Sequence, residues 1–193
     1  MSHISVLLHE TVDALVADRN TGIFVDGTFG RGGHTRLLLS KLDENARVYA
    51  FDKDPQALAV AAELEQQDPR FKIIHASFAD LKNEMNQRGI EEVDGVMADL
   101  GVSSPQLDQA ERGFSFMKDG PLDMRMDSSQ TIDAEYIVNT YSEEELVKIF
   151  FEYGEEKFSR RIAKAICESR KRAKIISTLQ LVEIVREGVP QKF

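Results

Sequence analysis

Residues 22–34 (GIFVDGTFGRGGH) decide how the first half of this 193-residue chain is interpreted. A short β-branched and aromatic run ends at Asp26, and a glycine-rich segment follows at once. Glycine allows positive φ and a close approach of the backbone to a ligand. The segment departs from the dinucleotide fingerprint G-x-G-x-x-G, because Thr35 takes the sixth position, and no P-loop Gly-Lys-Ser/Thr follows. By itself it is either a ligand-binding loop or a tight turn between a strand and a helix.

Segments typical of strands and of helices alternate around this stretch. The predicted strands are residues 22–26, 47–52, 71–75 and 93–99, and the predicted helices cover residues 35–42, 57–64 and 78–88. Such alternation predicts βαβ units and a parallel sheet, and therefore an α/β fold. Right-handed crossovers place the carboxyl ends of all these strands at one edge of the sheet, where ligands bind.

The second half of the chain has a different pattern. Residues 101–127 contain glycine and proline with little periodicity, which predicts an ordered loop or lid. Beyond Ser128 the helical segments follow a capping box at residues 142–145, span residues 157–174 and follow a second cap at residues 177–180. We therefore predict an α/β domain at residues 1–127, which includes the loop, and an all-helical subdomain at residues 128–193.

Composition limits the class of protein. Hydrophobic residues make up 42% of the chain and charged residues 30%, which allows a packed core. The single cysteine, Cys167, excludes a disulfide framework, and no Cys/His spacing resembles a metal site. Because no apolar run is long enough to cross a bilayer and no signal-peptide pattern is present, we expect a cytoplasmic protein without a membrane partner.

Charge is distributed unevenly along the chain. The net charge is −9, which argues against a uniformly basic nucleic-acid surface. Residues 157–174 nevertheless contain eight basic residues against one acid, Glu168, and this excess predicts a local RNA-binding patch. The alternative is that these charges pair with the acidic block at residues 143–156.

Three acids end predicted strands: Asp26, Asp52 and Asp99. At the end of the second strand, Asp52 is placed to accept hydrogen bonds from both ribose hydroxyls of a nucleoside. Its alternative role is to cap the following helix, which Asp54 could do equally well. Phe78 comes shortly after the third strand and either stacks on a purine ring or belongs to the core.

Four longer stretches of the sequence together resemble one known family. Residues 26–35 (DGTFGRGGHT), 99–108 (DLGVSSPQLD) and 112–127 (RGFSFMKDGPLDMRMD), with residues 3–10 (HISVLLHE), resemble the bacterial 16S rRNA (cytosine-N4)-methyltransferase family (RsmH/MraW). The resemblance implies N4-methylation of a cytosine in 16S rRNA of the small ribosomal subunit, with S-adenosylmethionine (SAM) as cofactor. It implies a class I SAM-methyltransferase fold, a Rossmann-like sheet interrupted after its fourth strand by an all-helical insert subdomain. Thr28 departs from the class, whose first loop usually has glycine there.

The resemblance also implies which residues surround the cofactor. They are Gly32, Gly33 and His34 at the methionine end, Asp52 at the ribose, Phe78 at the adenine, and Asp99 and Gln106 to complete the site. At the acceptor base we expect catalytic roles for Asp99, as the nearest charged group, and for Ser103 or Ser104, which would present an oxygen. The alternative for both serines is that they shape a turn before a proline.

Family members continue beyond residue 193, so we expect the C-terminal strands of the family sheet to be absent from this sequence. The fourth strand would then be an open edge, which favours a homo-oligomer. Two other classes of function stay open. One is a nucleotide-dependent oxidoreductase on a similar sheet, and the other is a non-catalytic RNA-binding or assembly factor.

Overall fold

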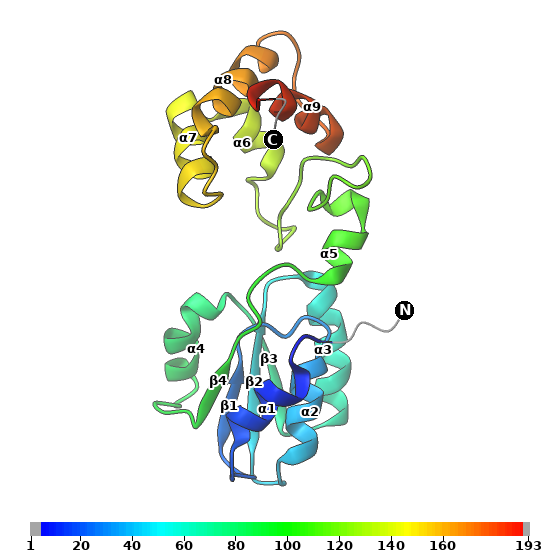
Figure 1. The fold of residues 1–193 in the computed structure, drawn as a ribbon. Coiled ribbons are helices and arrows are strands. Elements are labelled where there is room, and N and C mark those ends of the chain that lie inside the picture. Colours follow the sequence, from blue (N-terminus) through cyan, green and yellow to red (C-terminus); the bar gives the residue numbers. More distant parts are fainter. Residues whose placement is uncertain (1–4, 191–193) are drawn as a thin grey trace. The chain divides into compact units, whose positions relative to one another are not determined.

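The computed structural model describes residues 5–190 and divides the chain into two compact units, Met1–Gly101 and Val102–Phe193. The first unit contains a four-stranded sheet of order β3-β2-β1-β4 (Figure 1). Its strands are β1 (Ile23–Asp26), β2 (Arg47–Asp52), β3 (Phe71–His75) and β4 (Gly95–Met97). All neighbouring strands are parallel. The predicted α/β fold with a parallel sheet is therefore confirmed.

Helices cover both faces of this sheet. They are α1 (Leu8–Val16), α2 (Gly33–Lys41), α3 (Pro55–Gln67), the 3₁₀ turn η1 (Phe78–Asp80) and α4 (Leu81–Gln87). Phe24 of β1 packs in a core shared with α1, α2 and α3, whereas the adjacent Val25 packs in a second core with Met85 of α4. Successive residues of a strand point to opposite faces, so one central strand supports both layers.

The observed β4 is shorter than the predicted strand at residues 93–99. The Gly27 N–H donates to the Met97 carbonyl at 2.8 Å, which closes the ladder between β1 and β4. Two residues later the Asp99 N–H donates to the hydroxyl of Thr28 instead of to a neighbouring strand. After Met97 the backbone thus leaves the sheet, and a side chain rather than a strand accepts the Asp99 N–H.

The second unit is helical. Its elements are α5 (Ser104–Asp108), η2 (Ala110–Arg112), α6 (Ala134–Thr140), α7 (Glu143–Glu152), α8 (Ser159–Arg170) and α9 (Thr178–Gly188). Leu146, Ile166 and Ile175 are completely buried in its core. After Met97 the described residues add no strand to the sheet, and their backbone pairing of strand type is a single bridge between Pro121 and Ser177.

The segment at residues 101–127 differs from the prediction in two respects. It contains α5 and η2 rather than loop alone. It also lies in the second unit, because Leu122 is buried in the helical core and its carbonyl accepts the Glu135 N–H at 2.6 Å. The compact units therefore divide after Gly101, whereas the sequence suggested a division after Asp127.

Two general properties bear on function. Within residues 5–190, no helix has the length and apolar character needed to cross a membrane. The same residues contain no group of three or more His, Cys, Asp or Glu side chains arranged to hold a metal ion.

Candidate functional site

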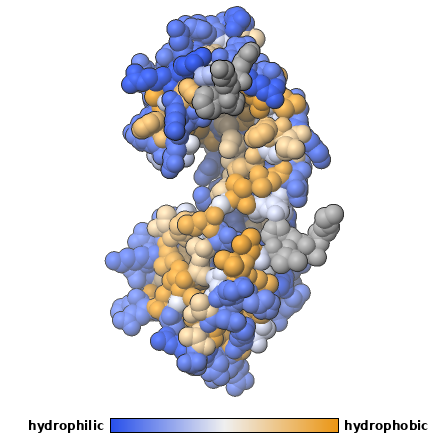
Figure 2. Space-filling model, viewed as in Figure 1, coloured by the Kyte–Doolittle hydropathy of each residue, from blue (hydrophilic) through white to orange (hydrophobic). Residues whose placement is uncertain are grey.

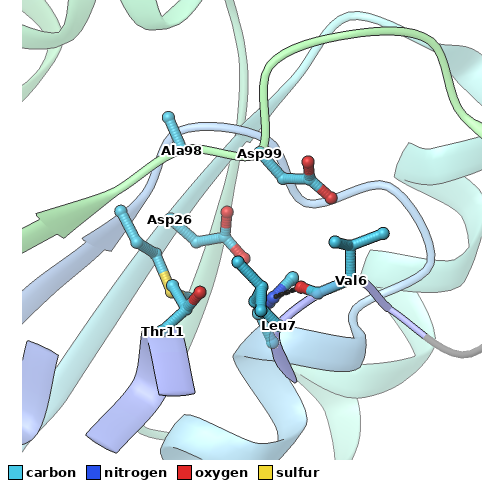
Figure 3. A pocket seen from close by; sticks show the side chains of 8 residues that line it. Val6, Leu7, Thr11, Asp26, Ala98 and Asp99 are labelled. Atoms are coloured by element: carbon cyan, nitrogen blue, oxygen red, sulfur yellow. Dashed lines mark hydrogen bonds between the residues drawn. The ribbon is translucent and has the colours of Figure 1, made fainter. Parts of the chain in front are cut away.

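A pocket opens at the carboxyl ends of β1 and β4 in the first unit (Figure 3). Its lining residues are Val6, Leu7, Thr11, Asp26, His34, Met97, Ala98 and Asp99. The cavity measures about 180 Å³, which is smaller than the several hundred Å³ of a site that encloses a drug-sized ligand. It therefore has room for one part of a ligand, such as a polar end group or a ring.

Asp26 forms the buried floor of this pocket. Only 2% of the residue is exposed. Its Oδ2 accepts the Thr35 hydroxyl at 2.6 Å, and its Oδ1 accepts the Thr28 N–H at 3.0 Å. Burial raises the pKa of the Asp26 carboxyl, while the hydrogen bonds from Thr35 and Thr28 oppose the rise. A cationic group that entered the pocket would favour the ionised form of this carboxyl.

His34 lies in the first turn of α2 and is nearly buried. Its Nε2 is 3.2 Å from the Val6 carbonyl oxygen. The two glycines before it allow the chain to pack closely here. Gly32 has φ +77°, and a side chain on Gly33 would collide with the Ser5 hydroxyl. The predicted residues at the start of α2 thus hold the segment at residues 5–7 against the pocket.

This N-terminal segment contributes apolar side chains that the sequence did not indicate as functional. Val6 is 69% exposed and Leu7 is 64% exposed, and both lie at the rim of the pocket (Figure 3). Leu7 has φ +49°, an unusual conformation for a residue with a side chain. Its carbonyl accepts the Thr11 N–H at 2.9 Å. Both apolar side chains are therefore available to contact a ligand in the pocket.

Asp52 connects the glycine segment to the end of β2. Its Oδ2 accepts the Gly30 N–H at 2.8 Å, and its Oδ1 accepts the Asp54 N–H at 2.9 Å. The capping role belongs to Asp54, whose carboxylate accepts the Gln56 N–H at the start of α3. Asp52 is only partly buried, and its predicted contact with a ribose stays a prediction.

Phe78 is not a core residue. It begins η1, directly after β3, and is 46% exposed. A β-carbon on Gly27 would lie 3.3 Å from that of Phe78. The β-carbon of Phe78 therefore lies beside the first loop, and the predicted contact of its ring with an adenine stays a prediction.

Asp99 reaches the pocket from the loop after β4 and is exposed. Figure 3 shows its carboxylate on the same side of the sheet as that of Asp26. The pocket thus brings together His34 and Asp99 from the predicted set, and Gly32 and Gly33 adjoin it in the chain. Asp52 and Phe78 do not line this cavity.

Ser103, Ser104 and Gln106 belong to the second unit, where they begin α5. The Ser103 N–H donates to Oε1 of Gln106 at 2.9 Å, in a capping box that starts this helix. The structure therefore gives Ser103 and Gln106 a local structural role, in line with the alternative of a turn before Pro105. Their contacts with a base or a cofactor stay predictions.

Sequence reasoning singled out Asp26 as a strand end but assigned it no role. Its position was already a signal, because ligands of parallel sheets bind at strand carboxyl ends. The contributions of Val6, Leu7 and Thr11 had no such signal. They depend on the placement of α1 beside β4, which periodicity does not predict.

Comparison with known proteins agrees with the resemblance. Among curated relatives, the chain is 66% identical to ribosomal RNA small subunit methyltransferase H of Acinetobacter baumannii (strain AB0057), 67% to that of Acinetobacter baylyi and 56% to that of Marinomonas sp.. These alignments cover 99%, 99% and 97% of this chain and 61%, 62% and 60% of the relatives. The chain thus spans about 61% of the length of the first of these relatives.

Among solved structures, an rRNA methylase from Streptococcus thermophilus aligns with 43% of this chain and 50% of its own, at 27% identity and a TM-score of 0.35. The family evidence covers far more of the sequence. Residues 1–193 match the family model described as the MraW methylase family. Since that match extends over every residue, the chain belongs to the MraW methylase family.

Proposed function

We propose that this chain binds SAM at the carboxyl edge of its sheet and serves the N4-methylation of a cytosine in 16S rRNA. The observation that carries the proposal is the pocket between the ends of β1 and β4, with a buried carboxyl at its floor and a second carboxylate at its rim. Membership of the MraW methylase family supports it. So do the names of the relatives, which describe methyltransferases of small-subunit ribosomal RNA.

The groups at this edge suit the parts of SAM. Asp26 presents a carboxyl to a cationic end group, Asp52 presents carboxylate oxygens to ribose hydroxyls, and Phe78 presents a half-exposed ring to a purine. Gly30, at φ +56°, has open space where a side chain would stand, so a ligand can approach the backbone there. The bound cofactor would supply an electrophilic methyl group on its sulfonium.

The nitrogen that accepts the methyl group is a weak nucleophile. The exocyclic nitrogen of cytosine shares its lone pair with the ring, and transfer needs this nitrogen about 3 to 3.5 Å from the methyl carbon and in line with it. Asp99 is placed at the pocket rim. There its carboxylate would accept an N4–H and localise the lone pair. The proton leaves only after the nitrogen has become cationic, so a strong base is not required.

The basic run at residues 157–174 supports an RNA-binding surface on the second unit. Arg160, Arg161 and Lys164 are exposed on α8. The ion pairs described for this run in residues 5–190 join Lys164 to Glu168 and Lys174 to Glu135, and none involves the acidic block at residues 143–156. The alternative that the two blocks neutralise each other therefore lacks support. An exposed excess of positive charge attracts the phosphate backbone.

Arg170 differs from the other residues of the run. Its guanidinium donates to the carbonyls of Val138 and Tyr141 at 2.7 and 2.6 Å, so it fastens the end of α6. An RNA test should therefore leave it intact. We expect the triple variant Arg160→Gln, Arg161→Gln, Lys164→Gln to weaken RNA binding and to reduce its salt dependence by about one unit per lost phosphate contact.

Filter binding at several salt concentrations measures this slope. The matched control is Lys41→Gln, Lys72→Gln, Lys82→Gln, which removes the same charge from exposed positions of the first unit. If both triple variants show the same salt dependence of RNA binding, the three α8 residues do not contact the RNA.

The central experiment is a calorimetric titration with SAM, followed by transfer of a tritiated methyl group to small-subunit RNA. Losing the charged hydrogen bonds of Asp52 in Asp52→Ala should weaken SAM binding about ten- to hundredfold. Because Asp52 also holds Gly30, each variant is compared at equal folded fraction by circular dichroism. Glu63→Ala, at an exposed position of α3, is the control.

The alternatives give different results in the same experiments. Binding of NAD without SAM would indicate an oxidoreductase, and RNA binding without SAM would indicate a non-catalytic factor. If Asp52→Ala binds SAM as tightly as the parent chain, the assignment of Asp52 is wrong.

We also infer that copies of the chain associate through the edge of the sheet. In the described part of the chain, β4 pairs only with β1, and Val96 at its centre is 50% exposed. Figure 2 shows apolar surface over this part of the first unit. An open edge favours pairing with a second copy, and a lysine there opposes it. Light scattering should detect association of the parent and its loss in Val96→Lys, whereas a monomeric parent would contradict this inference.

A further inference from the structure

Thr28 links the first loop to the loop that carries Asp99. Its hydroxyl oxygen accepts the Asp99 N–H at 2.6 Å, between residues 71 positions apart. Its own N–H donates to Asp26 at 3.0 Å, and the other oxygen of Asp26 accepts the hydroxyl of Thr35 on α2. A continuous series of hydrogen bonds thus connects α2, the end of β1 and the loop after β4.

Asp99 has few other restraints. β4 ends at Met97, and Ala98, Asp99 and Leu100 are all exposed. The last ladder bond is that between Gly27 and Met97. Among the hydrogen bonds described for residues 5–190, the Thr28 hydroxyl is the partner of the Asp99 N–H. Small rotations of this short loop would move the carboxylate away from the pocket.

We propose that Thr28 is a positioning residue, whose hydroxyl fixes the backbone at Asp99 so that the carboxylate faces the acceptor in the pocket. This inference rests on the proposed function only for its effect on methyl transfer. It explains why a residue with a hydroxyl stands where glycine is usual in the class. Glycine offers no acceptor to the Asp99 N–H, and valine has the shape of threonine without the acceptor.

The test compares Thr28→Val with Thr28→Ser, which restores the hydroxyl. Amide hydrogen exchange at Asp99, followed by NMR, is the first readout because it requires neither cofactor nor activity. Loss of one hydrogen bond should raise the exchange rate about tenfold in Thr28→Val and leave Thr28→Ser near the parent. Equal exchange rates in the parent and Thr28→Val would overturn the proposal.

Methyl transfer and SAM affinity are the second readouts. In Thr28→Val we expect single-turnover transfer to fall about tenfold to a hundredfold, since catalysis is sensitive to misplacement of about 1 Å. The dissociation constant for SAM should change by less than about threefold, because the proposed ribose and adenine contacts come from Asp52 and Phe78 and not from Thr28. Transfer at the parent rate in Thr28→Val would also overturn the proposal. A parent chain that binds no SAM would overturn the proposed function, while the exchange rate of Asp99 would still decide the role of Thr28.

Discussion

The two units of this chain fix their functional segments in different ways. In the first unit, backbone pairing between parallel strands places Asp26 and Asp52 at the same edge of the sheet, and β4 ends at that edge two residues before Asp99. In the second unit, side chains fasten distant backbone. Asn139 both donates to the Ile175 carbonyl at 2.8 Å and accepts its N–H at 3.0 Å, as a strand neighbour would.

Arginines extend this pattern in the second unit. Arg112 donates to the carbonyls of Arg125 and Met126, and Arg125 donates to that of Gln130. The guanidinium of Arg125 also donates two hydrogen bonds to Asp123 and holds the pKa of that carboxyl below its ordinary value. Irregular segments need such partners because buried peptide groups must be paired. The comparison teaches that positive charge in the second unit serves two purposes, structure and surface.

The largest expected effect tests the dependence of the first unit on its core. Phe51 lies on β2, is completely buried and packs in the same core as Val25 and Met85. Phe51→Ala should lower the free energy of unfolding by about 3–5 kcal/mol, through lost burial and the cavity left behind. Urea denaturation measures it. Phe116→Ala, at a position 66% exposed, should change stability by less than about 0.5 kcal/mol. Equal effects of the two variants would show that the sheet core is not what holds the site.

The next prediction concerns the side-chain bonds of the second unit. Asn139→Ala leaves both peptide groups of the buried Ile175 without their partner, and we expect a loss of about 2–3 kcal/mol. Thr140→Ala is the control, because Thr140 is exposed and, among the bonds described for residues 5–190, its hydroxyl donates to the Tyr136 carbonyl on its own helix. Thermal unfolding followed by circular dichroism separates them. A loss below about 0.5 kcal/mol for Asn139→Ala would remove the contrast between the units.

The sequence predicted local features of both units well. The strands at residues 47–52 and 71–75 were predicted to the residue, because periodicity and β-branched composition are local signals. In the second unit the local signals also succeeded, since the side chain of Ser142 accepts the Glu145 N–H and that of Ser177 accepts the Gln180 N–H. Prediction was best where the determinants lie within a few residues.

The sequence did not predict contacts between distant residues. The bond from Asp99 to Thr28 exists only because β4 lies beside β1, across two intervening strands in the chain. The segment around Leu122 joined the helical unit for a similar reason, since it pairs with Ile176 far along the chain. One local signal was overlooked. The Ser-x-x-Gln spacing at residues 103–106 is a capping-box pattern that predicts α5.

A pH titration tests how burial affects Asp26, at the floor of the pocket in the first unit. The folded-state pKa of Asp26 is raised, mainly by burial, so folded protein holds this proton to a higher pH than unfolded protein. The stabilisation is complete below the unfolded pKa and is lost as pH rises through the folded pKa. Relative to Asp26→Asn, the parent should lose up to about 1.4 kcal/mol per pH unit in that range. Urea denaturation from pH 4 upward checks this, and a constant difference would show that burial does not perturb Asp26.

The smallest expected effect concerns a local cap in the second unit. Ser142 and Glu145 form a capping box at the start of α7, with the Glu145 N–H donating to the Ser142 hydroxyl at 3.2 Å. Ser142→Ala should cost about 1 kcal/mol in the free energy of unfolding, and the exposed Ser128→Ala should cost less than about 0.5 kcal/mol. Both are measured by thermal unfolding beside Asn139→Ala. If the long-range bonds of Asn139 hold this unit together, Asn139→Ala must lose more stability than Ser142→Ala. The peptide groups at a frayed helix end can form hydrogen bonds with water, whereas the peptide groups of Ile175 are buried and cannot. A larger loss for Ser142→Ala would mean that local helix signals, and not side-chain bonds to distant backbone, hold the helical unit.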